Sequence, residues 1–165
     1  MKNTPNFIEI YDDVLSQDQC RQIITEFELD KISQEAGRCG EGVLEHIKKS
    51  TDINHLLHDS SLASSIIANS IGKPLQDYKT KYPEIDEITS WSFQPDYHIQ
   101  KYKPNEGYFA PHCEVTAAGE FSSRVLVWMY YLNDVDNGGT RFTNYDLNID
   151  AKAGTIIVFP SDLMH

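Results

Sequence analysis

A histidine and a glutamate stand two residues apart in the stretch "GYFAPHCEV", at His112 and Glu114. The spacing alone is not evidence, because 6 histidines and 25 acidic residues in 165 predict about one His-x-acid pair by chance. On a strand the two side chains would share a face, about 6 to 7 Å apart along the chain, which suits two ligands of one ion. Strand alternation sends Cys113 to the other face, where we expect a small buried filler.

The segment "GTIIVFPSDLMH" supplies a third candidate ligand, His165, after a predicted apolar strand over Thr155 to Phe159. Two histidines and one carboxylate with open positions form the facial triad that holds non-haem Fe(II). His112, Glu114 and His165 are therefore our candidate metal ligands. Zinc accepts the same donors around an open water position, so a cupin-like metal hydrolase or isomerase is an alternative.

Composition limits the class of protein. The length of 165 residues fits one domain, assigned to residues 1–165, and 40% hydrophobic with 24% charged residues is ordinary for a soluble globular chain. A formal net charge of −11 argues against sequence-independent nucleic-acid binding, which needs lysines and arginines. The chain has no apolar run of membrane-spanning length and no signal-peptide core in "MKNTPNFIEIYDD". We therefore expect a cytoplasmic protein with free thiols, because its three cysteines are widely spaced.

The N-terminal half is predicted to be rich in helices. A short strand pattern over Phe7 to Tyr11 precedes a helix that Ser16 should cap, with Gln19 completing a capping box. A second helical pattern from Leu62 is interrupted near "GKP" and stops before Pro83. The segment "SQEAGRCGEGVLEH" predicts a loop or an irregular sheet edge, because it is rich in glycine and polar residues.

Short β-branched and aromatic runs follow Pro83, divided by the turn signals "NDVDNGGT" and "DAKAG". The predicted strands are Ser90 to Phe93, Tyr97 to Lys103, Tyr108 to Thr116, Arg124 to Leu132, Arg141 to Thr143, and Thr155 to Phe159. Several short strands behind a helical half predict an α+β fold, a double-stranded β-helix (jelly roll) buttressed by N-terminal helices.

Three segments, "QKYKPNEGYFAPHCEV", "RVLVWMYYLNDVDNGGTRF" and "AKAGTIIVFPSDLMH", resemble in order and spacing the prolyl-4-hydroxylase-like 2-oxoglutarate and Fe(II)-dependent dioxygenases. The opening "FIEIYDDVLSQDQCRQII" is also typical of that family. The resemblance implies an oxidoreductase that uses O₂ to hydroxylate an unactivated C–H bond, of peptidyl proline or similar, and releases succinate and CO₂. Its partners would be the small-molecule co-substrate 2-oxoglutarate and a peptide or small-molecule prime substrate.

The resemblance also implies roles for single residues. His112 takes the place of the proximal histidine, Glu114 the place usually held by aspartate, and His165 the place of the distal histidine. Tyr102 and Tyr131 match tyrosines that hydrogen-bond the co-substrate in relatives, and strand alternation favours an inward-facing Tyr131. Packing of both tyrosines as ordinary core residues is the alternative.

Two departures from the family pattern leave alternatives open. Glu114 is one methylene longer than aspartate. Relatives also hold the distal carboxylate of 2-oxoglutarate with a lysine or arginine beyond the distal histidine, whereas this sequence ends at His165, before the expected final strand. Either later residues supply that cation, and even the distal histidine, or another basic residue substitutes.

Arg124 and Arg141 are the basic residues nearest to the motif strands. Strand parity counts against Arg124 as the missing anchor, and a solvated turn arginine is the expectation for Arg141. Because no residue clearly replaces the anchor, a jelly-roll binding module without turnover is the second alternative function.

Overall fold

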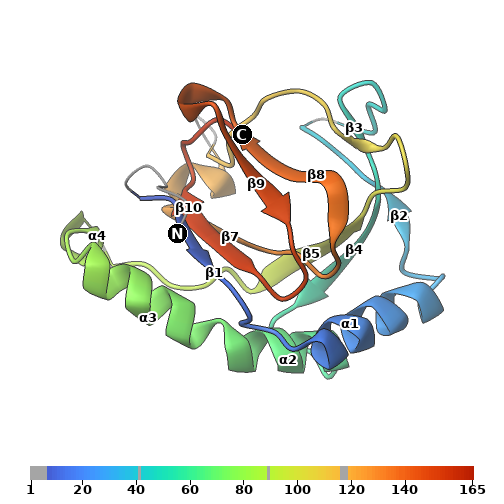
Figure 1. Ribbon diagram of the computed structural model, residues 1–165, viewed down its shortest axis with the longest axis horizontal. Helices are drawn as coiled ribbons and strands as arrows, with labels where there is room; N and C mark the ends of the chain where they lie inside the picture. The colour runs from blue at the N-terminus through green and yellow to red at the C-terminus, as the bar shows by residue number, and fades with distance from the viewer. Residues whose placement is uncertain (1–6, 41, 89, 116–118) are drawn as a thin grey trace.

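The computed structural model describes residues 7–40, 42–88, 90–115 and 119–165 (Figure 1). Helices α1 to α3 form a layer along one side of the molecule, below the strands in Figure 1. The helices and 3-10 turns are α1 (Gln17–Leu29), α2 (Leu62–Ser70), α3 (Gly72–Lys81), α4 (Ile85–Ile88), η1 (Glu120–Ser123) and η2 (Thr143–Tyr145). Within the described ranges, no helix has the length and apolar character needed to cross a membrane.

The first two long helices begin at serine caps. Ser16 and Gln19 form the predicted capping box of α1, in which each side chain accepts a hydrogen bond from the other residue's backbone N–H. The Ser61 side chain caps α2 by accepting the Ser64 N–H, and the carboxylate of Glu26 accepts two more N–H groups at that helix start. Because a negative charge is favourable at a helix N-terminus, Glu26 joins α1 to α2.

The predicted interruption of the second helical pattern is confirmed. Ile71 is both the C-cap of α2 and the N-cap of α3, so the break is a single residue placed just before "GKP". Helix α3 ends at Lys81, two residues before Pro83, as the sequence predicts.

Four antiparallel sheets make up the β part of the described chain. Their strand orders are β1-β10-β7, β2-β4-β5, β3-β6 and β8-β9. The strands are β1 (Glu9–Tyr11), β2 (Glu35–Ala36), β3 (Lys48–Lys49), β4 (Thr51–Leu56), β5 (Asp96–Lys101), β6 (Gly107–Tyr108), β7 (Leu126–Tyr130), β8 (Val135–Phe142), β9 (Leu147–Ala151) and β10 (Ile156–Pro160). The mixed helix and antiparallel-sheet architecture agrees with the predicted α+β class, although hydrogen bonds among these strands do not close a barrel.

Strand β10 is buried on both faces and separates two core layers. Ile156 and Val158 pack toward α3, whereas Ile157 and Phe159 pack against Phe142 and its neighbours on β8 and β9. These four of the five β10 residues are fully buried, which explains the continuous apolar run "IIVF". The face of Ile157 and Phe159 is the one that leads to the candidate site.

Three local predictions are wrong. Ser90–Phe93 forms no strand, and the six-residue strand β4 has no counterpart among the predicted strands. The predicted turn "NDVDNGGT" instead opens β8, which bulges between Val135 and Gly139. Gly139 has φ 119°, and a Cβ there would lie 1.9 Å from the Ile149 carbonyl oxygen, so the glycine lets the bulged strand approach β9.

Candidate metal centre

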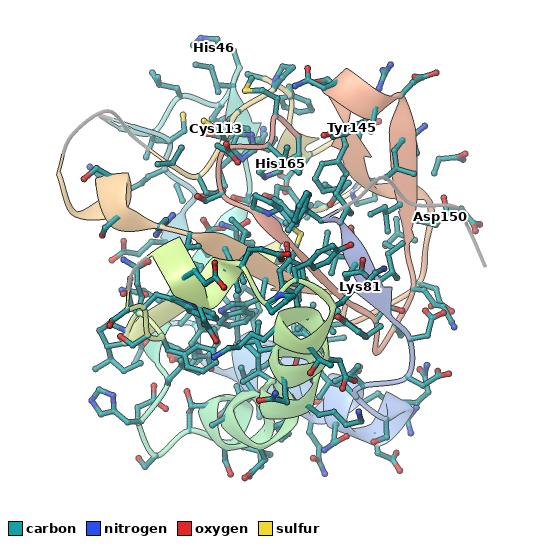
Figure 2. The ribbon with its side chains drawn as sticks, turned by 90° about the vertical axis from the view of Figure 1, so that its left-hand side faces the viewer. His46, Lys81, Cys113, Tyr145, Asp150 and His165 are labelled. Atoms are coloured by element: carbon teal, nitrogen blue, oxygen red, sulfur yellow. The ribbon has the colours of Figure 1, made fainter. Side chains whose placement is uncertain are left out.

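His112 and His165 are paired through their backbones. Each N–H donates to the other residue's carbonyl oxygen at 3.0 Å, which is the exchange seen in a hydrogen-bonded pair of antiparallel strands. This pair brings the two imidazole centroids to 4.5 Å. Figure 2 accordingly shows His165 beside the segment that carries Cys113.

The local structure around His112 differs from the predicted strand over Tyr108–Thr116. Only Tyr108 of that range belongs to β6, and Thr116 lies outside the described residues. His112 and Glu114 therefore do not share a face through regular strand alternation. Instead, the Glu114 N–H donates to the Ser161 carbonyl at 2.9 Å, so the irregular segment is held against the chain just after β10.

The three predicted ligands lie together. Glu114 Oε1 is 3.4 Å from His112 Nε2 and 3.9 Å from His165 Nε2. One ligand atom from each residue lies within 4.8 Å of the other two, so these side chains could hold a metal ion. The His165 side chain is only 4% exposed, whereas those of His112 and Glu114 are 21% and 31% exposed, which places the cluster at an accessible edge of the core.

Hydrogen bonds at Nδ1 orient both imidazoles. His112 Nδ1 lies 3.2 Å from the Ala110 carbonyl oxygen, and His165 Nδ1 lies 2.9 Å from that of Leu163. A neutral His165 that donates from Nδ1 carries its lone pair on Nε2, and in both rings Nε2 is the nitrogen that faces Glu114. Backbone carbonyls behind metal-binding histidines play this role in metalloproteins.

The fit to a cation is strongest at His165 Nε2. This atom is buried, and the described residues give it no hydrogen-bond partner. A buried acceptor left without a partner costs about 1–3 kcal/mol, and a bound cation would supply the missing partner. The nearby carboxylate of Glu114 would balance part of the charge of such an ion.

The electrostatics favour ligand-competent protonation states. The hydrogen bond from His112 is the largest cause of the lowered pKa of Glu114, and the charge of Arg124 adds to it despite the burial of the carboxylate. Burial, together with the charge of His112, lowers the pKa of His165. Near neutral pH the cluster therefore presents a carboxylate and an uncharged buried imidazole, the forms that bind metals.

Aromatic rings enclose both histidines. The Tyr108 ring stacks on His112 with a centroid distance of 3.6 Å and an interplanar angle of 12°. Phe159 and Phe142 pack around His165, with ring centroids 4.9 Å and 5.9 Å away. The sequence reasoning missed these three residues, because stacking between residues distant in sequence or in an irregular segment has no local pattern.

Arg124 is a further residue of the site that sequence reasoning did not assign to it. Its Nη1 lies 2.9 Å from Glu114 Oε2, and its Nε donates to Gln94 Oε1 at 2.9 Å. Strand parity counted against Arg124 as the missing co-substrate anchor, but β7 begins only at Leu126, so the alternation does not extend back to this residue.

Tyr131 lies immediately after β7 and packs against the same core cluster as Phe142 and Phe159. Its hydroxyl donates to Thr140 Oγ1 at 2.7 Å, and burial raises its pKa to about 12. The inward orientation expected from alternation is thus present, because Tyr130 instead points to the helix layer and pairs with Ser70.

Tyr102 lies at the outer edge of the site, just after β5. The residue is 39% exposed, and its hydroxyl donates to Gln100 Oε1 at 2.9 Å. Partial burial of the phenol, followed by the charges of Asp52, Tyr108 and Glu114, raises the pKa of Tyr102. The co-substrate contacts expected for Tyr102 and Tyr131 stay predictions.

Three minor expectations have mixed outcomes. The side chain of Arg141 is 67% exposed and pairs with Asp146 at 3.4 Å, so it is a solvated arginine as expected, although it lies on β8. All three thiols are free, as predicted. Cys113 is only half-buried, with its thiol directed to the Val115 carbonyl, so the prediction of a buried filler is wrong.

Solved structures with a similar fold include several prolyl hydroxylases. A Pseudomonas putida prolyl-4-hydroxylase matches with a TM-score of 0.70 and 15% identity over 96% of this chain and 83% of that chain. The viral collagen prolyl hydroxylase of Paramecium bursaria Chlorella virus-1, as its 2-oxoglutarate complex, matches with a TM-score of 0.65 and 20% identity over 94% of this chain and 78% of that chain. A Trichoplax adhaerens prolyl hydroxylase in complex with a hypoxia-inducible-factor peptide fragment matches with a TM-score of 0.68 and 16% identity over 97% of this chain and 76% of that chain.

No protein-family model matches the sequence, and no curated protein matches it either. The structural matches at 15–20% identity show the fold, which is prolyl-4-hydroxylase-like.

Proposed function

We propose that this chain is an Fe(II)- and 2-oxoglutarate-dependent oxygenase that hydroxylates an unactivated C–H bond in a peptide, at proline or a similar residue. The observation that carries the proposal is the convergence of His112, Glu114 and His165, whose ligand atoms lie within 4.8 Å of one another. Two imidazoles and one carboxylate are the donor set of non-haem Fe(II) oxygenases. The likeness in fold to prolyl hydroxylases supports the same reading.

The donor set alone is shared with zinc hydrolases, so the choice of iron rests on the fold. When bound at His112, Glu114 and His165, Fe(II) would activate O₂, which is the oxidant for the hydroxylation. The protein's own residues would supply geometry and a dry environment. The Nδ1 hydrogen bonds and the Tyr108 stack fix the imidazoles, and Phe159 shields His165 from water.

Tyr131 and Thr140 form the polar part of the inner wall. Their hydroxyls are hydrogen-bonded to each other within a core otherwise formed by Phe142, Phe159 and aliphatic neighbours. Tyr131 packs with Phe142 and Phe159, the two rings that contact His165. A pair of hydroxyls in this apolar cluster suits one carboxylate of a small dicarboxylic acid, which would exchange the hydroxyl–hydroxyl bond for two charge-assisted ones. We assign Tyr131 to the co-substrate on this basis.

The outer edge of the site suits a peptide. Tyr102 and Phe109 are 39% and 54% exposed, and they belong to the same segment as Tyr108 and His112. Exposed aromatic rings beside a reactive centre offer stacking surfaces for proline or apolar side chains. The peptide complex of the Trichoplax neighbour supports a peptide as prime substrate at the level of the fold.

Succinate production tests the proposed activity. The purified chain is incubated with Fe(II), 2-oxoglutarate and O₂, with and without proline-containing peptides, and succinate is measured by NMR. The wild type should form succinate, His112→Ala should form none, and Arg141→Gln, an exposed change away from the cluster, should match the wild type. Succinate that is still formed by His112→Ala would exclude the assigned metal ligands.

A further inference from the structure

The two carboxylate oxygens of Glu114 have different partners. Oε1 faces both histidines, at 3.4 Å and 3.9 Å from their Nε2 atoms, whereas Oε2 is 2.9 Å from Arg124 Nη1. A glutamate has one more rotatable bond than the aspartate it replaces. Without a second partner its carboxylate would be free to turn and present both oxygens to one ion.

Arg124 is itself held in place, so it cannot simply follow such a movement. Its Nε donates to Gln94 Oε1 at 2.9 Å, and its carbonyl accepts the Ser161 hydroxyl at 2.6 Å. The Ser161 carbonyl in turn accepts the Glu114 N–H at 2.9 Å. Arg124 and Glu114 are thus fixed to the same residue at the end of β10, and a guanidinium holds a carboxylate oxygen by a directional, charge-assisted bond.

We propose that Arg124 is a positioning residue that retains Oε2 of Glu114, so that the glutamate offers the metal a single oxygen. The inference rests on the proposed metal site. Three single-atom ligands leave about three positions of an octahedral ion open, and a co-substrate chelate with O₂ needs all of them. A glutamate that chelates with both oxygens would take one of these positions away.

Removal of Arg124 therefore has an unusual expected signature. The Arg124 guanidinium and a bound divalent metal ion would repel each other, because both are positively charged. Loss of the guanidinium should therefore not weaken metal binding through the electrostatic interaction. A residue needed only for folding would, on removal, weaken metal binding along with thermal stability. The number of open positions on the bound ion separates the two roles.

The test uses Mn(II) as the probe, with Arg124→Gln compared with the wild type and with Arg141→Gln as the matched arginine control. We measure the Mn(II) Kd and the water-proton relaxation per bound ion, which counts coordinated water. The Mn(II) Kd of Arg124→Gln should not rise above about three times the wild-type value. The bound ion should lose about one of its three coordinated waters. The relaxation enhancement should fall by roughly a third, and 2-oxoglutarate should bind the loaded variant about tenfold more weakly.

Equal relaxation per bound ion in Arg124→Gln and wild type would overturn the role of Arg124 and leave the proposed function intact. Failure of the wild type to bind Mn(II) would overturn both. If Arg124→Gln does not fold, Arg124→Lys keeps the positive charge but loses the fork that holds Oε2 and Gln94 together. That variant should also lose bound water, and wild-type relaxation in a folded Arg124→Lys protein would contradict the proposal.

Discussion

His112 and His165 donate backbone hydrogen bonds to each other's carbonyl oxygens, both at 3.0 Å. The candidate metal centre is therefore set by the pairing of two irregular segments, one after β6 and one after β10. Glu114 joins the same pairing through Ser161. Because backbone bonds hold the histidines, single side-chain replacements at the centre should leave the fold in place.

Replacement of the inner ligand tests this separation of site and scaffold. His165→Ala should lower the affinity for Mn(II) or Fe(II) by more than about 100-fold. Loss of a residue that only hydrogen-bonds a metal ligand already lowers metal affinity by about 10–100-fold, and loss of a ligand itself should cost more. The backbone pair with His112 does not need the imidazole, so circular dichroism should be unchanged. Isothermal titration calorimetry measures the affinity, and near-wild-type binding by His165→Ala would remove this residue from the ligand set.

The stack of Tyr108 on His112 should contribute to metal binding through ring orientation. Tyr108→Leu should weaken Mn(II) binding up to about tenfold, since an aromatic pair is worth about 0.5–1.5 kcal/mol. Tyr108→Phe keeps the stacked ring and should bind like the wild type. Equal losses in both variants would mean that the hydroxyl, and not the stack, matters.

Tyr131 and Tyr130 provide a matched pair for the co-substrate assignment. Tyr131→Phe should weaken 2-oxoglutarate binding to the metal-loaded protein by about 10-fold or more, because a hydrogen bond to a charged group is worth about 1.5–3 kcal/mol. Tyr130→Phe loses a hydroxyl that pairs with Ser70 on the helix side and should leave this affinity unchanged. Similar co-substrate affinity for both variants would favour the alternative that Tyr131 is an ordinary core residue.

Acid should destabilise the metal-free protein partly through His165. Burial holds its pKa below the ordinary value of 6.5, so between 6.5 and that lowered pKa the unfolded chain binds a proton that the folded protein does not. Stability is therefore lost as the pH falls below 6.5. The melting temperature should fall less between pH 7.5 and pH 5.5 for His165→Gln than for the wild type. An equal fall in both proteins would contradict the buried, neutral imidazole.

The bulge of β8 should depend on Gly139. Gly139→Ala should destabilise the protein by about 1–3 kcal/mol, because φ is 119° and the added Cβ would meet the Ile149 carbonyl oxygen at 1.9 Å. Gly72→Ala is the control, since Gly72 lies in the first turn of α3 and no atom lies within 4 Å of its added Cβ. Urea unfolding curves compare the two, and equal stability of both variants would contradict the bulge.

Elements fixed by local chemistry were predictable from the sequence. The capping box of Ser16 and Gln19, the break before "GKP" and the apolar strand that became β10 each have a signature within a few residues. The three candidate ligands came from a resemblance in motif order, and the structure places them together for a different reason from the predicted strand alternation.

Long-range pairing was not predictable. Strand β4 owes its conformation to partners β2 and β5, and β8 owes its bulge to β9, so neither has a strong local pattern. The strand-parity argument does not apply to Arg124, because β7 begins two residues later, at Leu126. Its partner Glu114 is an acidic residue ten positions earlier on another segment, a pairing that no sequence period indicates.

Anaerobic visible absorption on addition of Fe(II) and then 2-oxoglutarate is the experiment that we would perform first. If His112, Glu114 and His165 bind iron and leave adjacent positions open, a metal-to-ligand charge-transfer band of the 2-oxoglutarate chelate should appear in the wild type. His112→Ala should not form the band, whereas Arg141→Gln should form it in full. Absence of the band in the wild type, or its persistence in His112→Ala, would contradict the proposed oxygenase site.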